Sequence, residues 1–178
     1  TSFTPMGSEV QVLQCAPFLR VLFLMDASLY FAYGSNMDPL QMEDRCPGAV
    51  ESGVAVLEGW SFVINRRGVA TVKNDRGCMV WGVLWRLSEE DESALDVYES
   101  VAEGNYRKER LVVSQHEKWV EALVYVDPIT EAGRPRAGYL DGVLAGAGHF
   151  GLPEGYRAEL TGWREENDGE VHISDPRD

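Results

Sequence analysis

The chain has 178 residues and a mass of 19.8 kDa, which is enough for one domain or at most two small ones. Its 44% apolar and 25% charged residues are ordinary for a globular protein and disfavour an intrinsically disordered chain. The net charge of −13 would repel the phosphates of nucleic acids and the anionic surface of a membrane, so we expect neither as a partner.

The cysteines and histidines show neither a disulfide framework nor a metal centre. Cys15, Cys46 and Cys78 stand far apart and their number is odd, and the three histidines are scattered without an HExxH motif. We therefore expect no transition-metal site and a reducing, cytoplasmic compartment. Carboxylates alone would still be able to hold a hard cation.

The most apolar run is Ala16–Met25, whose ten residues fall well short of the roughly 20 that a membrane-spanning helix needs. No basic segment precedes it, as a signal peptide would require, so we expect a packed terminal strand or an extension outside the fold. The last 15 residues are polar and acidic, as in a loosely held tail. The predicted organisation is an extension over residues 1–28, one domain over 29–163 and a tail over 164–178.

The first well-patterned segment is a short aromatic strand, Leu29–Tyr33, which runs into a tight turn at Gly34-Ser35-Asn36. A helix is predicted directly afterwards, with Asp38 as its N-cap and Pro39 at its first position. This helix must end near Cys46, because a Pro-Gly pair follows.

Between residues 53 and 87, apolar runs alternate with turn signals at Glu58-Gly59, Arg66-Arg67-Gly68 and residues 74–77. Short connections of this kind imply antiparallel pairing, and hence a meander or a barrel. The four predicted strands are Val54–Leu57, Ser61–Asn65, Val69–Lys73 and Cys78–Leu87.

The clearest helix starts at Ser88, an N-cap followed by three acids that the helix dipole favours, and is predicted to continue toward Val101. Two further strands are predicted at Tyr106–Ser114 and Trp119–Val126, and a loop follows at Pro128–Gly138. The last two helices are predicted at Tyr139–Phe150 and Pro153–Trp163. Seven strands and four helices that do not alternate as strand–helix–strand units predict an α+β fold. We expect a mixed, largely antiparallel, barrel-like sheet with flanking helices.

Neither a GxSxG motif nor a P-loop occurs, and two segments are left as candidates for chemistry. The first is Tyr30-Phe31-Ala32-Tyr33-Gly34-Ser35-Asn36, in which a strand ends at a glycine shortly before a helix. Backbone N–H groups in such a turn, with the nearby helix N-terminus, can form a site for an anion or an oxyanion. Taken alone, the segment is more typical of a plain strand-to-helix turn with core aromatics.

The second candidate is Glu99. At about 100° per residue, Leu95, Tyr98 and Val101 share an apolar stripe, and Glu99 lies at its edge. A carboxylate on a semi-apolar edge can have a raised pKa and act as a base. Taken alone, Glu99 is more typical of one further acid on a solvated helix, because residues 89–103 contain seven acids.

Together these segments resemble the γ-glutamyl cyclotransferase-like (AIG2-like) family. That family shows a YGSN turn, a Gly-hydrophobic-Ala-Thr strand, a V-W-G-V-type strand, an L-D-x-x-E segment and a later tyrosine loop. The matching segments are Tyr33–Asn36, Gly68–Thr71, Val80–Val83, Leu95–Glu99 and Gly104–Tyr106, and Tyr139 and Gly151–Tyr156 also look family-like. The resemblance extends from about Leu29 to Trp163. The family often has glycine after the glutamate, where this chain has Ser100.

The resemblance implies an acyltransferase- or lyase-type enzyme without a metal or an organic cofactor. Its substrate would be a small molecule with a γ-glutamyl group, whose free α-amine attacks its own γ-carbonyl, forms 5-oxoproline and expels the attached amine or amino acid. The resemblance assigns the acid/base role to Glu99 and glutamyl binding to residues 30–36, with Tyr139 and Tyr106 lining the pocket. Backbone N–H groups of Gly34–Asn36 would stabilise the oxyanion.

Several alternatives stay open at this point. The leaving half is a free amino acid, the ε-amine of lysine or an amine of a biosynthetic intermediate. The rival functions are a non-catalytic binding protein of the same fold and a hydrolase that releases glutamate. Arg66 and Arg67 are expected to be solvent-exposed, and would meet a substrate carboxylate only if their turn borders the pocket. A homodimer is compatible with the sequence.

Overall fold

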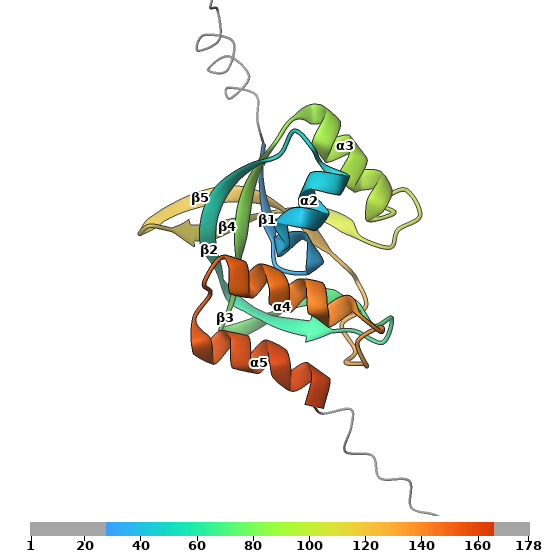
Figure 1. Ribbon diagram of the computed structural model, residues 1–178, viewed down its shortest axis with the longest axis vertical. Coiled ribbons are helices and arrows are strands. Elements are labelled where there is room, and N and C mark those ends of the chain that lie inside the picture. The colour runs from blue at the N-terminus through green and yellow to red at the C-terminus, as the bar shows by residue number, and fades with distance from the viewer. Residues whose placement is uncertain (1–27, 166–178) are drawn as a thin grey trace, which may run out of the picture.

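The computed structural model describes residues 28–165, so the predictions for the N-terminal extension and for the end of the acidic tail lie outside the described residues. Within this range five strands and four α-helices pack around one core (Figure 1). The strands are β1 (Ser28–Ala32), β2 (Val50–Ile64), β3 (Ala70–Leu87), β4 (Arg107–Gln115) and β5 (Lys118–Val126). The helices are α2 (Pro39–Arg45), α3 (Glu89–Tyr98), α4 (Tyr139–His149) and α5 (Glu154–Glu165), with a 3-10 turn η1 (Ser35–Met37) before α2. The predicted α+β class is confirmed.

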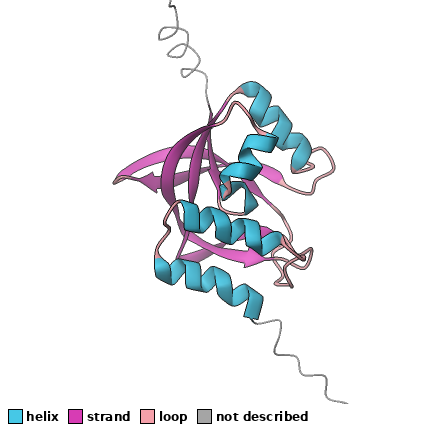
Figure 2. Ribbon diagram, viewed as in Figure 1, coloured by secondary structure: helices cyan, strands magenta, loops and turns pink. Residues whose placement is uncertain are grey.

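The strands form a closed barrel in the order β1-β3-β2-β4-β5. Figure 2 shows these strands in magenta, with the helices in cyan packed beside them. All neighbours are antiparallel except β1 and β5, which pair in parallel at Tyr30 and Leu123 and so close the barrel. The barrel interior and the inner faces of the helices share one apolar core, in which each fully buried large side chain contributes roughly 1.5–3 kcal/mol. Its fully buried large members include Phe31, Met37, Leu57, Ile64, Leu84, Leu95, Leu123, Leu152 and Leu160.

The structure has fewer and longer strands than the sequence predicts. The hairpin turn at Arg66-Arg67-Gly68 is confirmed, but the two other predicted turns are irregularities inside continuous strands β2 and β3. The pairing moves from Glu58 with Met79 directly to Trp60 with Asn74, so residues 75–78 bulge opposite Gly59. Turn residues and bulge residues are the same types, because both need a local departure from the extended backbone.

The two predicted N-caps, Asp38 and Ser88, are confirmed. Asp38 caps α2 by accepting from the Leu40 backbone N–H at 3.1 Å, and Pro39 is the first helical residue. Ser88 caps α3 in a capping box with Asp91, which is buried and also accepts from the backbone N–H of Gly48 at 3.1 Å. Among residues 28–165, no helix combines the length and the apolar character needed to cross a bilayer.

Helix α4 lies very close to η1, which brings Tyr139 at its first turn next to the segment after β1 (Figure 1). A Cβ placed on Gly146 would come within 2.5 Å of the Met37 carbonyl carbon, so only glycine permits this approach. Residues 146–151 also match the pattern GxGxxG, but Gly151, with φ +61°, ends α4 there. The pattern therefore does not open a helix after a strand, as a phosphate-binding loop would.

We predict that Gly146→Ala lowers the free energy of unfolding by about 2 kcal/mol or more, because the added methyl group would force α4 away from η1. Gly148→Ala, two residues along the same helix, meets no atom within 4 Å and should instead raise stability by up to about 1 kcal/mol. Urea unfolding of both variants measures the difference. Equal effects at the two positions would contradict close packing of α4 on η1.

Candidate functional site

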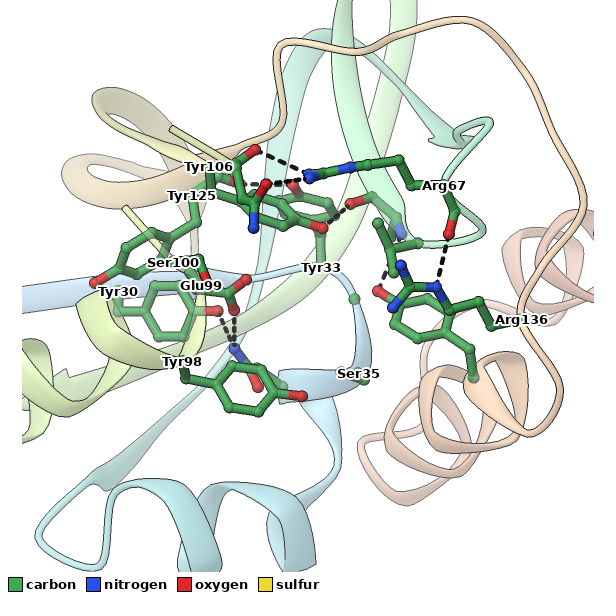
Figure 3. Close-up of a pocket in the computed structure, with 16 residues that line it drawn as sticks. Tyr30, Tyr33, Ser35, Arg67, Tyr98, Glu99, Ser100, Tyr106, Tyr125 and Arg136 are labelled. Carbon is green, nitrogen blue, oxygen red and sulfur yellow. Dashed lines mark hydrogen bonds between the residues drawn. The ribbon is translucent and has the colours of Figure 1, made fainter. Parts of the chain in front are cut away.

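A polar cavity of about 230 Å³ lies at one end of the barrel, where four segments distant in sequence meet (Figure 3). They are the end of β1 with η1, the start of β3, the loop from α3 to β4, and the start of α4. The predicted site residues that line this cavity are Tyr30, Tyr33, Gly34, Ser35, Asn36, Glu99, Tyr106 and Tyr139. Its other lining residues are Arg67, Val69, Ala70, Tyr98, Ser100, Asn105, Tyr125 and Arg136.

Phe31 and Ala32, which were also predicted to bind substrate, do not line the cavity. Both side chains are completely buried in the core. The Phe31 ring and the Ala32 carbonyl pack directly against Gly82 of β3, leaving no room there for a side chain. Their place in an aromatic strand therefore reflects packing of β1 on β3.

A second cavity of about 460 Å³ lies between α5 and the outer parts of β2 and β3. It is lined mostly by apolar and aromatic side chains, including Phe62, Met79, Trp81 and Trp163. None of the predicted site residues reaches it. The cavity at the end of the barrel is therefore the candidate site.

Glu99 enters the cavity because α3 ends earlier than the sequence suggests. The helix stops at Tyr98 rather than near Val101, and Glu99 is its C-cap, with its backbone N–H donating to Leu95 at 2.8 Å. Ser100 then adopts φ +51°, a left-handed conformation that glycine takes at lower cost. This geometry explains why glycine suits the position after the glutamate, and Ser100 shows that serine can adopt it.

The Glu99 carboxyl group is poorly solvated. Burial raises its pKa from 4.5 to about 7, while the hydrogen bond from Asn36 and the charges of Arg45 and Arg67 oppose part of the rise. Asn36 Nδ2 donates to Glu99 Oε1 at 3.0 Å and to the Tyr30 hydroxyl at 2.8 Å (Figure 3). Glu99 is thus able to exchange a proton near neutral pH.

Two tyrosines are fixed by the peptide at the start of β3. The Ala70 backbone N–H donates to the Tyr139 hydroxyl at 3.0 Å, and the Tyr106 hydroxyl donates to the Ala70 carbonyl at 2.8 Å. The proton of Tyr139 is therefore available to a ligand as a donor, whereas Tyr106 offers lone pairs. Burial raises the pKa of Tyr139 to about 12 and also raises that of Tyr106, so both hydroxyls are neutral near pH 7.

Gly34 leaves little space for a side chain. Its φ is −107°, so a left-handed backbone is not the reason for glycine here. A Cβ at this position would lie 3.0 Å from Tyr139 Oη and 3.3 Å from the Ala70 Cβ. The Tyr139 phenol therefore lies against the turn that is predicted to stabilise the oxyanion.

The turn after β2 borders the cavity, but its two arginines differ. Arg66 is exposed, as expected, whereas Arg67 is half-buried and lines the cavity. Arg67 Nε donates to Asp127 Oδ2 at 2.9 Å, and its Nη1 donates to Asn105 Oδ1 at 2.6 Å. Asp127 is completely buried and also accepts from Asn65 Nδ2 at 2.6 Å, so its charge is paired.

Several residues of the cavity or its support are not identified as site residues from the sequence, among them Arg45, Asn105, Tyr125, Asp127 and Arg136. Arg136 lines the mouth, where its Nε donates to the Arg67 carbonyl at 2.7 Å (Figure 3). Its loop carries only turn signals, and nothing local distinguishes it. Arg45 is the one residue with a usable local signal, because it follows Gln41 by four positions on the same face of α2.

Comparisons with known proteins identify the family of this chain. A sequence model of the AIG2-like family matches residues 79–160. A γ-glutamylcyclotransferase of Mus musculus is 33% identical over 158 residues, which cover 83% of this chain and 84% of the relative. This chain belongs to the γ-glutamylcyclotransferase family. The resemblance predicted from the sequence is thereby confirmed.

Further relatives extend the match to the human protein and to a solved structure. The γ-glutamylcyclotransferase of Homo sapiens is 30% identical over 146 residues, covering 76% of this chain and 78% of the relative. A solved γ-glutamyl cyclotransferase structure superposes with a TM-score of 0.71 at 29% identity, covering 76% of this chain and 86% of its own. Both matches span most of the γ-glutamylcyclotransferase fold.

Glu99→Gln should stabilise the fold, and more so near pH 8 than near pH 5. Because folding raises the pKa of Glu99, the wild type loses stability as the pH rises from about 4.5 to about 7, whereas glutamine cannot ionise. The stability difference should grow by up to about 3 kcal/mol over this range. Urea unfolding at both pH values tests this, with exposed Glu103→Gln as the control. A difference independent of pH would show that Glu99 is not desolvated.

Proposed function

We propose that this chain is a γ-glutamyl cyclotransferase, which converts a γ-glutamyl amine or γ-glutamyl amino acid into 5-oxoproline and the free amine. The observation that carries the proposal is a desolvated carboxyl group, Glu99, facing a small polar cavity in a chain of this family. A cytoplasmic location and a homodimer stay predictions from the sequence.

The reaction needs a base at the attacking nitrogen. The α-amine of the substrate is largely protonated near neutral pH, since its ordinary pKa is about 8. The Glu99 carboxylate takes a proton from it, and the neutral nitrogen forms a bond to the γ-carbonyl carbon of the same molecule. Burial suits Glu99 to this step, because a base whose pKa is near the working pH is most effective.

The same group serves the second half of the reaction. Protonated Glu99 returns its proton to the leaving nitrogen as the bond between that nitrogen and the carbonyl carbon breaks. Two protons in all pass from the attacking to the leaving nitrogen, and no electrons are exchanged. We assign oxyanion stabilisation to the Tyr139 hydroxyl, with the N–H groups of the turn at Gly34–Asn36 supporting it. One such donor is commonly worth about 3 kcal/mol of the barrier.

The cavity supplies the geometry. Both reacting atoms belong to one molecule, so the site must hold the glutamyl chain curled with its amine against its γ-carbonyl, and such positioning can remove several kcal/mol from the barrier. Tyr30, the turn after β1, Tyr106 and Tyr139 all contribute to the cavity wall. A glutamyl chain held in this curled form places its own amine next to the γ-carbonyl carbon, which favours cyclisation over attack by water.

Glu99→Gln should abolish 5-oxoproline formation while the thermal midpoint stays at or above that of the wild type. For the wild type, kcat/KM should rise with pH through about 7, since only ionised Glu99 acts as a base. Mass spectrometry of products from a panel of γ-glutamyl dipeptides and amines measures this, with Glu103→Gln as the matched control. Free glutamate in place of 5-oxoproline would favour the hydrolase, and ligand-induced stabilisation without product would favour the binding protein.

The mouth of the cavity favours a leaving group that carries a carboxylate. Arg67 and Arg136 lie there, and Asp127 neutralises only the first of them. The exposed guanidinium of Arg136 would attract the carboxylate of a leaving amino acid and repel the ammonium group of a diamine. Among the open alternatives, we therefore propose a free amino acid as the leaving half.

Arg136→Gln should lower kcat/KM for γ-glutamylalanine about tenfold and leave γ-glutamylethylamide nearly unchanged, because the two substrates differ by one carboxylate. Arg66→Gln, in the exposed neighbouring turn position, is the control and should affect neither substrate. The quantity to compare is the ratio of the two kcat/KM values. A ratio that Arg136→Gln leaves unchanged would exclude Arg136 as the carboxylate contact.

A further inference from the structure

Arg45 lies outside the cavity but contacts residues that line it. It is the last residue of α2 and does not line the cavity, yet its guanidinium donates to Asn36 Oδ1, to Ser35 Oγ at 3.3 Å and to Gln41 Oε1 at 2.6 Å. The plane of the guanidinium is also covered by the Tyr98 ring, with the central carbon 3.8 Å from the ring centroid. Arg45 is therefore held on several sides without touching the cavity.

Asn36 is buried, and its side-chain amide is oriented by these contacts. Its two N–H groups donate to Tyr30 and Glu99, and its oxygen accepts from Arg45. If the amide were turned over, its oxygen would face the Glu99 carboxylate, and its N–H groups would face the donors of Arg45. Both contacts would then be repulsive, so a fixed guanidinium permits only one orientation.

We infer that Arg45 is a positioning residue, which holds the Asn36 oxygen and thereby keeps the Asn36 N–H groups directed at Glu99 and Tyr30. This inference deepens the proposed function and rests on it, because the role of Glu99 as the base is what gives the orientation its importance. Arg45 acts through Asn36 and does not contact the reacting atoms.

Helix α2 prepares Arg45 for this contact. Asp38, Gln41 and Arg45 follow one another at spacings of three and four residues, and so share one face of the helix. Asp38 caps the helix and also accepts from Gln41 Nε2 at 3.3 Å, and Gln41 in turn accepts from Arg45. A row of side chains thus fixes the guanidinium before any substrate binds.

The surroundings of Glu99 predict the effect of losing this contact. The charged groups that act on it are Arg45, Arg67 and Asp127, and the titratable phenols around it are Tyr30, Tyr33, Tyr106 and Tyr139. The phenols are neutral, so they do not compensate for a missing cation. Without Arg45, the Glu99 carboxylate loses a nearby positive charge, and the Asn36 N–H group is no longer held toward it. Both losses favour the protonated form of Glu99.

The test compares Arg45→Met and Arg45→Lys with Arg157→Met, which removes an exposed cation from α5. The first readout is the pH dependence of kcat/KM for 5-oxoproline formation. We expect Arg45→Met to move its acid limb upward by about one pH unit or more, with activity recovering above the shifted limb. Arg45→Lys keeps the positive charge but loses the several N–H donors of the guanidinium, so the acid limb of this variant should shift less. Arg157→Met should leave the acid limb unchanged.

The second readout does not depend on turnover. Glu99 is titrated by NMR of ¹³C-labelled glutamate carboxyl groups, with Glu99→Gln identifying its resonance. The Glu99 titration should shift most in Arg45→Met, less in Arg45→Lys and not in Arg157→Met. In the Asn36→Ala background, Arg45→Met should shift it less than the same substitution does in the wild type. If the wild type makes no 5-oxoproline, the proposed function fails, and the NMR titration still decides the role of Arg45.

Two outcomes would overturn the inference. An acid limb and a Glu99 titration that stay in place in both Arg45 variants, with activity reduced equally at every pH, would leave Arg45 only a structural role. Equal shifts with and without Asn36 would show that the charge of Arg45 acts directly on Glu99. If Arg45→Met does not fold, Arg45→Lys carries the test alone, and an unshifted titration in that variant would contradict the inference.

Discussion

The site depends on keeping one carboxyl group out of water without leaving it unpaired. Burial alone would hold Glu99 protonated through the neutral range, and full pairing with a cation would hold it ionised. The structure lies between these limits, because a neutral amide donates to Glu99 while Arg45 and Arg67 act on it from farther away. This balance brings its pKa to about 7. The early end of α3 places Glu99 at the cavity, and the turn after β1 provides the Asn36 amide that donates to it.

The barrel supplies the fixed frame for that balance. Closing β1 against both β3 and β5 fixes the direction in which the turn after β1 leaves the sheet. The backbone of Ala70, the first residue of β3, then fixes two hydroxyl groups. Its N–H donates to the Tyr139 hydroxyl, and its carbonyl accepts from the Tyr106 hydroxyl. The close approach of α4 to η1 places Tyr139 in the wall of the same cavity as Glu99. Backbone geometry thus determines the position of most groups around the cavity, which limits how far they can relax.

Local features could be predicted from the sequence, and features set by distant contacts could not. The caps at Asp38 and Ser88 and the hairpin at Gly68 depend on a few adjacent residues, and all three are found as predicted. The strands were divided at residues 58–59 and 74–77 because bulges and turns use the same residue types. The family motifs name Glu99, Tyr106, Tyr139 and the turn after β1 as cavity residues, but not Tyr125 or Arg136. The burial of Asp127 and the contact between Arg45 and Asn36 are tertiary, and no spacing along the chain reveals them.

The parallel seam between the first and the fifth strand of the described barrel also has a consequence for synthesis of the chain. β1 can pair with β3 once residue 87 has left the ribosome, but its second partner, Leu123, emerges later, and Tyr139 later still. Until then the cavity around Glu99 lacks part of its lining, because Tyr125 and Tyr139 follow Glu99 in the chain. The sheet can therefore close around this carboxyl group only after the strand that contains Leu123 has been synthesised.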